Sequence, residues 1–248
     1  MSKDLFSQQA SAYAKYRPGY PSELIEHILS FVPSKEVAWD CATGNGQAAS
    51  LLTPYFKKIF ATDISEKQIA QAILHPAIQY SVGSGELTNF PDSQFDLITV
   101  AQAYHWFQFK EFSIEAIRVG KPGAVIAIWG YGLLQSNVPE LNNQIRYYYR
   151  DVMGAYWDPE RKFVDEEYKT LPFYFDELPP ARFEERVSWT FADFVGYLNT
   201  WSSLQHYIRA NATNPVENFS NSVQFFWTEK ESQEFSFPIF LRMGRIIK

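Results

Sequence analysis

Two glycines separated by one residue follow an apolar run near the start of the chain. The run ends at Trp39, Asp40 comes next, and Gly44-Asn45-Gly46 follows shortly after. Glycine lets a loop between a strand and a helix adopt positive φ, and its missing Cβ lets the backbone approach a ligand closely. The letters from Gly44 to Ala49 also fit Gly-x-Gly-x-x-Ala, a pattern typical of dinucleotide-binding loops. The spacing therefore predicts a cofactor loop, although a tight turn without any ligand needs the same glycines.

Two aspartates help to distinguish between the cofactors that such a loop can bind. Asp40 ends the first predicted strand, where the pyrophosphate of a dinucleotide would meet an unfavourable negative charge. The cationic amino-acid part of S-adenosylmethionine would instead gain from an acid there. Asp63 ends the second strand and can accept hydrogen bonds from the ribose hydroxyls of either cofactor. Asp40 therefore favours S-adenosylmethionine, while a nicotinamide-dependent oxidoreductase stays the alternative.

His105 lies just after the predicted fourth strand, where its side chain could reach a bound substrate. Methyl transfer from a sulfonium is an in-line displacement, so the protein has mainly to align the reactants and exclude water. His105 would be a general base if the accepting atom had to lose a proton. It could equally pack beside Trp106 as structure or orient a ligand, and a carboxylate acceptor needs no base.

Alternating apolar runs and helical patterns predict the elements that position these residues. The expected strands are 37–39, 59–62, 78–82, 95–100 and 124–129. The expected helices between them are one over 22–32, one through Leu51 and Phe56, one from the capping box at Ser65 through Ile73, and one over 110–119. Nearly continuous apolar strands alternating with helices indicate a parallel sheet that is covered on both faces.

The pattern changes after Tyr131, where aromatic helices replace the regular alternation. The segments expected there are a helix over 141–152, a strand over 183–190, helices over 194–204 and 216–226, and a last strand over 235–243. Pro238 lies within that last run and argues against a central strand, because proline cannot donate to a ladder.

Composition excludes several other classes of protein. The net charge is −6 and the basic residues form no long cluster, which argues against a nucleic-acid partner. The single cysteine excludes an internal disulfide and a multi-cysteine metal site, and no His/Asp/Glu spacing suggests a metal. There is no apolar signal region, and the longest apolar stretch, 124–134, is too short to cross a bilayer. We therefore expect a cytoplasmic monomer that acts on a small molecule.

The run from Asp40 to Gly46 resembles motif I of the class I S-adenosylmethionine-dependent methyltransferases. The usual pattern is Asp-x-Gly-x-Gly-x-Gly, and Ala42 replaces its first glycine. The stretch from Phe90 to Phe107, together with 17–21 and 200–203, is similar to the trans-aconitate methyltransferase group of small-molecule methyltransferases. The resemblance covers nearly the whole chain and is strongest over 1–130.

This resemblance implies an α/β fold with a Rossmann-like, seven-stranded, mostly parallel sheet, helices on both faces and a helical aromatic cap. It implies a single domain over 1–248, with an N-terminal lid arm at 1–20 and a substrate-cap insertion at 133–180. The last strand, 235–243, would be antiparallel. The implied cofactor is S-adenosylmethionine.

The resemblance and the loop together assign roles to individual residues. The predicted cofactor-binding residues are Tyr13, Arg17, Asp40, Ala42, Gly44, Gly46, Asp63, Ile64, Ser84, Gly85, Glu86, Ala101 and Gln102. The predicted substrate-binding residues are His105, Trp106, Tyr148, Trp157 and Trp201, of which His105 is also the catalytic candidate. Three cap arginines, Arg146, Arg150 and Arg161, could hold an acidic substrate or simply face solvent.

These residues predict an S-adenosylmethionine-dependent methyltransferase that acts on a small molecule, at oxygen and conceivably at a carboxylate. An NAD(P)-dependent oxidoreductase and a cofactor-binding protein without catalysis are the alternatives. The residues of the cap determine the methyl acceptor, and their spacing does not name it.

Overall fold

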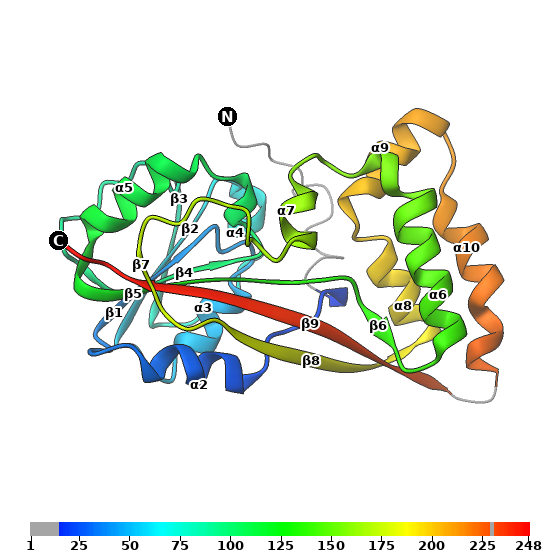
Figure 1. Ribbon diagram of the computed structural model, residues 1–248, viewed down its shortest axis with the longest axis horizontal. Coiled ribbons are helices and arrows are strands. Elements are labelled where there is room, and N and C mark those ends of the chain that lie inside the picture. The colour runs from blue at the N-terminus through cyan, green and yellow to red at the C-terminus, as the bar shows by residue number, and fades with distance from the viewer. Residues whose placement is uncertain (1–14, 229–230) are drawn as a thin grey trace.

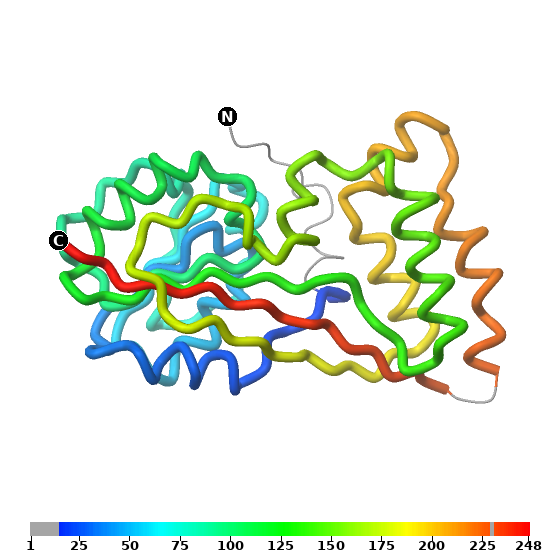
Figure 2. Tube along the Cα trace, in the orientation of Figure 1, coloured from blue at the N-terminus to red at the C-terminus, as the bar shows by residue number. Residues whose placement is uncertain are grey.

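The computed structural model describes residues 15–228 and 231–248, which form two lobes (Figure 1). One lobe is a sheet with helices packed on both faces. The other is a group of helices beyond the carboxyl end of β5 (Gly120–Tyr131). Figure 2 shows that the chain passes between the lobes several times, so neither lobe is a separate contiguous segment.

The sheet confirms the predicted α/β architecture. Its parallel part has the order β3-β2-β1-β4-β5, and β9 joins β5 antiparallel. The other strands are β1 Val37–Cys41, β2 Lys58–Asp63, β3 Ile78–Val82, β4 Phe95–Ala101, β6 Gln135–Ser136, β7 Asp176–Glu177, β8 Ala181–Thr190 and β9 Ser232–Arg245. The described residues contain nine strands rather than seven, because β6 and β7 add two-residue pairings along β9.

The two faces of the sheet bury alternate residues of each strand, as a pleated strand requires. Ala38 and Leu97 belong to the core under α2 (Ser22–Ser30) and α3 (Gln47–Leu52). Trp39 and Ile98 belong to the opposite core, under α5 (Phe109–Val119). Because both faces are covered, the parallel strands show the nearly continuous apolar runs that predicted them.

Two predicted helices are shorter in the structure, and local hydrogen bonds explain why. Helix α4 covers only Glu66–Ile69, because the amide of Ile73 donates to the carbonyl of Asn45 instead of continuing the helix. Ser65 nevertheless caps α4 by accepting from the amide of Gln68. The helix expected over 194–204 is divided into α8 (Phe191–Leu198) and α9 (Ser202–Asn211).

Side chains at the end of α8 cause that division. Asn199 donates to the carbonyl of Val195, and the hydroxyl of Thr200 donates to the carbonyl of Tyr197. Polar side chains that bond to nearby carbonyls in this way compete with continuation of a helix. Trp201 then adopts an extended conformation and α9 begins after it.

The last strand expected over 235–243 forms as β9 despite Pro238, and it is a central strand of the sheet. Strand β9 pairs with β8 along one side and with β5 and then β6 along the other. Pro238 lies where the partner changes from β5 to β6, so its missing N–H interrupts no pairing with either strand there. Its carbonyl still accepts a hydrogen bond from the amide of Gly132.

The helical lobe has an aromatic core. Its helices are α6 (Pro139–Tyr147), α8, α9 and α10 (Pro215–Val223), with a π-helical turn at Tyr148–Val152 after α6. Tyr148 stacks on Phe219 with ring centroids 4.1 Å apart, and Phe194 stacks on Phe235 at 5.4 Å. The contact with Phe235, which belongs to β9, joins the lobe to the sheet.

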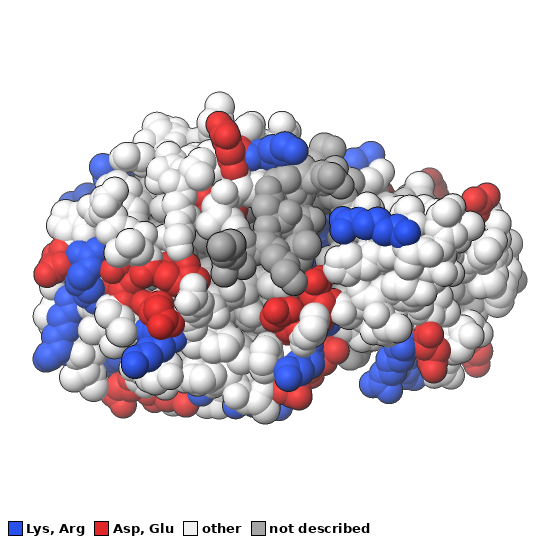
Figure 3. All heavy atoms as spheres, turned by 90° about the horizontal axis from the view of Figure 1, so that it is seen from above, with Lys and Arg blue, Asp and Glu red and all other residues white. Residues whose placement is uncertain are grey.

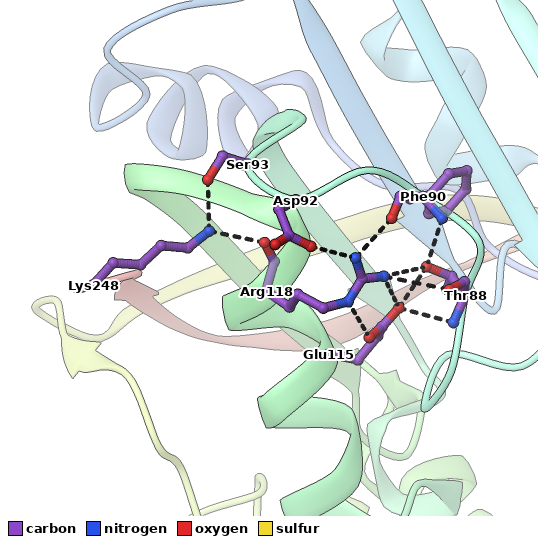
Figure 4. A network of polar contacts seen from close by, with 7 residues as sticks. All are labelled: Thr88, Phe90, Asp92, Ser93, Glu115, Arg118 and Lys248. Carbon is purple, nitrogen blue, oxygen red and sulfur yellow. Dashed lines mark hydrogen bonds and ion pairs between the residues drawn. The ribbon is translucent and has the colours of Figure 1, made fainter.

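An ion pair between the buried Glu115 and the half-buried Arg118 fixes the loop that enters β4 (Figure 4). The guanidinium of Arg118 binds Glu115 and Asp92 and also reaches the carbonyl of Phe90. Glu115 in turn accepts from the amide and hydroxyl of Thr88. Burial raises the pKa of Glu115, but the bonds from Arg118 and Thr88 outweigh it and hold this pKa below its usual value. The cluster ties α5 to the segment that follows Glu86.

The surface gives two further observations. On the face drawn in Figure 3, acidic and basic side chains are interspersed rather than gathered by sign. In the described ranges, no helix is long and apolar enough to cross a membrane.

Candidate cofactor and substrate site

The glycine loop links β1 to α3 through a series of left-handed residues. Ala42, Gly44 and Gly46 have φ of 56°, 58° and 86°. A Cβ on Gly46 would lie 2.1 Å from the hydroxyl oxygen of Tyr80, so glycine is required there for space as well as for conformation. A Cβ on Gly44 would meet nothing within 4 Å, which leaves the backbone of the loop open on that side.

Asp40 lies beneath this loop and is completely buried. Its carboxylate accepts hydrogen bonds from the hydroxyls of Thr43 and Thr99. Burial raises the pKa of Asp40 to about 6, although these two bonds and one from the amide of Ala49 lower it. Because the side chain has no exposed surface, Asp40 acts on a ligand through the shape and charge of the loop rather than by direct contact.

Asp63, at the end of β2, lies beside the same loop. One carboxylate oxygen accepts from the amide of Gly44 at 2.8 Å, and the other accepts from the amide of Ser65 at 2.8 Å. A carboxylate oxygen can accept more than one hydrogen bond, so these contacts are compatible with a further hydroxyl donor. The neighbouring Ile64 is 38% exposed and offers an apolar surface next to the acid.

The segment Ser84–Glu86 is brought against the end of β1. A Cβ on Gly85 would lie 2.6 Å from the sulfur of Cys41, so only glycine permits this close approach. The hydroxyl of Ser84 donates to the carboxylate of Glu86, which also accepts from the amide of Gln108. These three predicted cofactor-binding residues therefore lie at the same end of the sheet as the glycine loop.

The end of β4 supplies a strained residue to the site. Gln102, directly after Ala101, has a φ of 57°, which is unfavourable for a residue with a side chain. Its amide donates to the carbonyl of Trp129, and its side chain donates to the carbonyl of Tyr131. These contacts hold the strained conformation, and such strain is common at functional sites.

A cavity lies between the two lobes, with side chains from both. It is lined by Arg17, Gln102, His105, Trp106, Trp157, Asp158, Arg161 and Ser202. Arg17 joins the lobes at its edge, because its guanidinium donates to the hydroxyl of Tyr131 on β5 and to the carbonyl of Thr200 before α9. The cavity thus combines two guanidiniums, one carboxylate, a histidine, an amide and two indoles.

His105 is buried beside this cavity and is held by a tyrosine. Its Nδ1 lies 2.7 Å from the hydroxyl oxygen of Tyr168, which is itself fully buried. Burial, with a smaller contribution from the charge of Arg161, lowers the pKa of His105 to about 3. The imidazole is therefore neutral at physiological pH, so that it can donate or accept a hydrogen bond but carries no charge.

Tyr168 reaches His105 from a left-handed turn. Its φ is 57° and that of Glu167 is 56°. Arg242, on β9, stabilises the turn by donating to the carbonyls of Tyr168 and Leu171. The last strand of the sheet thereby positions a residue beside the cavity.

Arg161 is the cap arginine that the fold brings to the cavity. It lies in α7 (Arg161–Asp165), where its Nε donates to the hydroxyl of Tyr149 at 2.8 Å and lies 3.5 Å from the carboxylate of Asp165. Its guanidinium carbon is 5.0 Å from the ring centre of Trp157. Among the described residues, its two Nη groups form no hydrogen bond, so they are available to an anion.

The structure separates the predicted substrate residues into two groups. His105, Trp106 and Trp157 line the cavity, whereas Tyr148 and Trp201 lie outside its lining and in the core of the helical lobe. Tyr148 stacks on Phe219 and is 5.7 Å from the ring of Trp201, so both serve packing.

Two of the predicted cap arginines lie away from the cavity. Arg146 and Arg150 line a separate groove beside β9 and not the cavity. Tyr13 lies outside the described residues. The cavity also contains Ser202, from the 200–203 stretch, and Asp158, which no sequence motif indicated. For Tyr168, likewise, the sequence carries no signal, because its position depends on the turn held by Arg242.

No metal site is formed by the described residues, which contain no group of three or more His, Cys, Asp or Glu side chains able to hold an ion.

Comparisons with known proteins agree on one family. Residues 39–128 match the methyltransferase domain family. A solved structure from Anaeromyxobacter dehalogenans, described as a type II methyltransferase, is 36% identical, covers 94% of this chain and 99% of its own, and superposes with a TM-score of 0.86. A protein of Dictyostelium discoideum named as a methyltransferase is 29% identical over 98% of this chain and 95% of its own length.

A third relative carries the cofactor in its name. A protein of Saccharomyces cerevisiae named as an S-adenosylmethionine-dependent methyltransferase is 22% identical over 84% of this chain and 83% of its own length. These similarities favour a methyltransferase over the oxidoreductase alternative, and the open, left-handed glycine loop above Asp40 fits the cofactor of that family. The chain belongs to the class I S-adenosylmethionine-dependent methyltransferases.

Proposed function

We propose that this methyltransferase transfers a methyl group to an oxygen of a small acidic molecule, at a carboxylate. The observation that carries the proposal is the position of Arg161, which lines the cavity between the lobes while its Nε donates to the hydroxyl of Tyr149. A guanidinium held in this way suits a carboxylate, which it can bind through two charge-assisted hydrogen bonds. The narrower similarity to the trans-aconitate methyltransferase group supports the same class of acceptor.

The glycine loop would hold the cofactor at the carboxyl end of the sheet. Gly44 and Gly46 would lie against its methionine part, with Ala101 and Gln102 on the other side of it. Asp63 would accept from the ribose, while Ile64 and the segment Ser84–Glu86 would surround the adenine. Bound S-adenosylmethionine supplies an activated methyl group on a sulfonium. Arg17 would close the site from the N-terminal side, because it already contacts both lobes.

The protein's own contribution is then alignment, exclusion of water and neutral hydrogen bonding. A carboxylate is already ionised at neutral pH, so its methylation needs no general base. His105 would orient the acceptor: if the hydroxyl of Tyr168 donates to Nδ1, the proton of the imidazole is on Nε2 and can be donated to a carboxylate oxygen. Trp106 and Trp157 would shield the reacting atoms from solvent.

The proposal is tested by identifying methylated products. The full-length protein is incubated with S-adenosylmethionine and a panel of small carboxylic acids, phenols and amines, and the products are analysed by mass spectrometry. We expect methyl esters of carboxylic acids. Methylated phenols or amines without any ester would contradict the proposal.

The role of Arg161 is tested by substitution. Arg161→Gln removes the charge but keeps a polar side chain, and we expect it to raise KM for the acid by about tenfold or more, since hydrogen bonds to charged groups contribute about 1.5–3 kcal/mol. Arg146→Gln is the matched control, because Arg146 is a cap arginine outside the cavity. Equal effects of the two substitutions would refute the assignment. Calorimetry with S-adenosylhomocysteine shows whether cofactor binding is intact in both variants.

A further inference from the structure

Asp158 is a buried carboxylate in the same cavity, and the proposed methyl transfer does not use it. It is 7% exposed and lies between Trp157 and α7. It lines the cavity together with both guanidiniums, Arg17 and Arg161, and with His105. An acid in a cavity that receives an acid is unexpected, because like charges repel.

The carboxylate of Asp158 has an oxygen without a partner. Its Oδ2 is buried and forms no hydrogen bond with any of the described residues. The Nδ1 of His206 is 4.0 Å from this oxygen, beyond hydrogen-bond distance, and donates instead to the carbonyl of Tyr156 at 2.9 Å. A buried carboxylate oxygen that lacks a donor is costly, so a donor from a bound molecule would be strongly favoured.

Local structure does not account for this side chain. Asp158 precedes the short helix α7, and its main-chain carbonyl accepts from the amide of Arg161. Its carboxylate, however, caps no amide of that helix, because α7 has no side-chain cap. The side chain of Asp158 therefore lines the cavity without capping the helix that follows it.

We propose that the methyl acceptor carries a hydrogen-bond donor, a hydroxyl or an ammonium group, beside its carboxylate, and that Asp158 receives this donor. Arg161 would bind the carboxylate while Asp158 binds the neighbouring group, so that the two side chains recognise the two ends of a hydroxy acid or an amino acid. The inference rests on the proposed methylation of a small acid. It makes Asp158 the residue that determines specificity.

This arrangement also rejects acids without a donor. A molecule whose only polar groups are carboxylates would place a second anion beside Asp158 or would leave the Oδ2 of Asp158 buried without a donor. A monocarboxylate without a hydroxyl or ammonium group would also leave this oxygen without a donor. Sites built to bind a hydroxyl or amine discriminate strongly against analogues that lack it, because their own polar group is then left unpaired. Asp158 would therefore select against a tricarboxylate such as trans-aconitate.

The test uses acceptors that differ in one group. Succinate, malate and aspartate carry a methylene, a hydroxyl and an ammonium group at the same carbon, and 3-phenylpropionate, phenyllactate and phenylalanine form a second such series. The value of kcat/KM is measured by mass spectrometry of the products. In at least one series we expect the hydroxyl or the ammonium acid to exceed the methylene acid by about tenfold or more.

Two substitutions distinguish the two donors. Asp158→Leu removes both the charge and the hydrogen-bond acceptor. We expect it to bring the ratio of kcat/KM between the hydroxyl or ammonium acid and the methylene acid of each series close to one. Asp158→Asn keeps a neutral acceptor, so it should abolish a preference for ammonium but retain part of a preference for hydroxyl. The matched control is Glu160→Gln, which neutralises an acid that is two residues further along the chain and does not line the cavity. The ratios of kcat/KM for this variant should equal those of the wild type. Thermal unfolding verifies that all variants are folded.

The outcomes separate this inference from the proposed function. Ratios that are unchanged in Asp158→Leu would overturn the inference, and esters would still support the proposed function. Weaker binding of S-adenosylhomocysteine to Asp158→Leu would also overturn it, because Asp158 would then serve the cofactor. Methylation at nitrogen, with a preference that still depends on Asp158, would support the inference and contradict the proposed function. If none of the six acids binds or is methylated, both are refuted.

Discussion

Asp40 gives a prediction about stability that can be worked out from its surroundings. Its carboxylate is completely buried beneath the glycine loop, and burial raises its pKa from 3.8 to about 6. A carboxyl group with a higher pKa in the folded state than in the unfolded chain favours folding when it is protonated. Its contribution to stability is therefore complete below about pH 4 and is lost as the pH rises through about 6.

The size of this effect follows from the difference between the two pKa values. One pKa unit corresponds to about 1.4 kcal/mol, so ionisation of Asp40 costs the folded state about 3 kcal/mol at neutral pH. Asp40→Asn keeps nearly the same shape without the charge, and the hydroxyls of Thr43 and Thr99 can rotate to suit it. We expect the stability of the variant, relative to the wild type, to increase by about 2.4 kcal/mol between pH 4 and pH 7.5, because the unfolded chain is already partly ionised at pH 4.

Urea denaturation of both proteins at several pH values across this range measures the difference directly. The comparison cancels the titration of all other groups, since these are shared. Thr99→Ser serves as a control, because it changes the same buried site but keeps the hydroxyl, and it should follow the pH profile of the wild type. A difference between Asp40→Asn and the wild type that does not vary with pH would refute the assigned ionisation of Asp40.

Four further predictions concern other parts of the site and its support. Gly46→Ala should destabilise the protein by about 3 kcal/mol, from a strained φ and the clash with Tyr80, and the added substitution Tyr80→Phe should recover part of this loss in chemical denaturation. Glu115→Gln should cost about 2 kcal/mol of stability by breaking the ion pair in Figure 4, with kcat/KM unchanged at a temperature where the variant is folded. Because the pKa of His105 is lowered to about 3, its imidazole stays neutral, and the pH profile of kcat should show no step near 6.5 between pH 5 and 8. Tyr168→Phe should lower kcat/KM several-fold without changing cofactor affinity, and an equal loss of both would contradict a positioning role.

The sequence predicted the conformation of the glycine loop well, because its determinants are local. Left-handed φ at Gly44 and Gly46 follows from residue type and spacing, and the structure shows both. Even Ala42, which departs from the usual glycine, keeps the left-handed conformation with a φ of 56°. The five parallel strands were also predictable, since strands that are buried on both faces leave nearly continuous apolar runs.

The sequence was less informative for the aromatic helices. Tyr148 and Trp157 belong to the same predicted cap, yet Tyr148 is packed in the core and Trp157 lines the cavity. An apolar ring at helical spacing has the same pattern whether its face meets a core or a ligand. The effect of Pro238 on β9 was also not predictable from the sequence. It depends on the point at which the neighbour of β9 changes from β5 to β6.

What the sequence by itself determined is the place and conformation of the glycine loop, with its two glycines, the acid beneath it and the acid that follows on the next strand. What only the tertiary structure decided is the cavity between the lobes, because it brings together His105 after β4, Asp158 and Arg161 before and in α7, and Ser202 in α9. These residues are far apart along the chain and no local pattern connects them. Their proximity results from the way the helical lobe packs against the carboxyl end of the sheet.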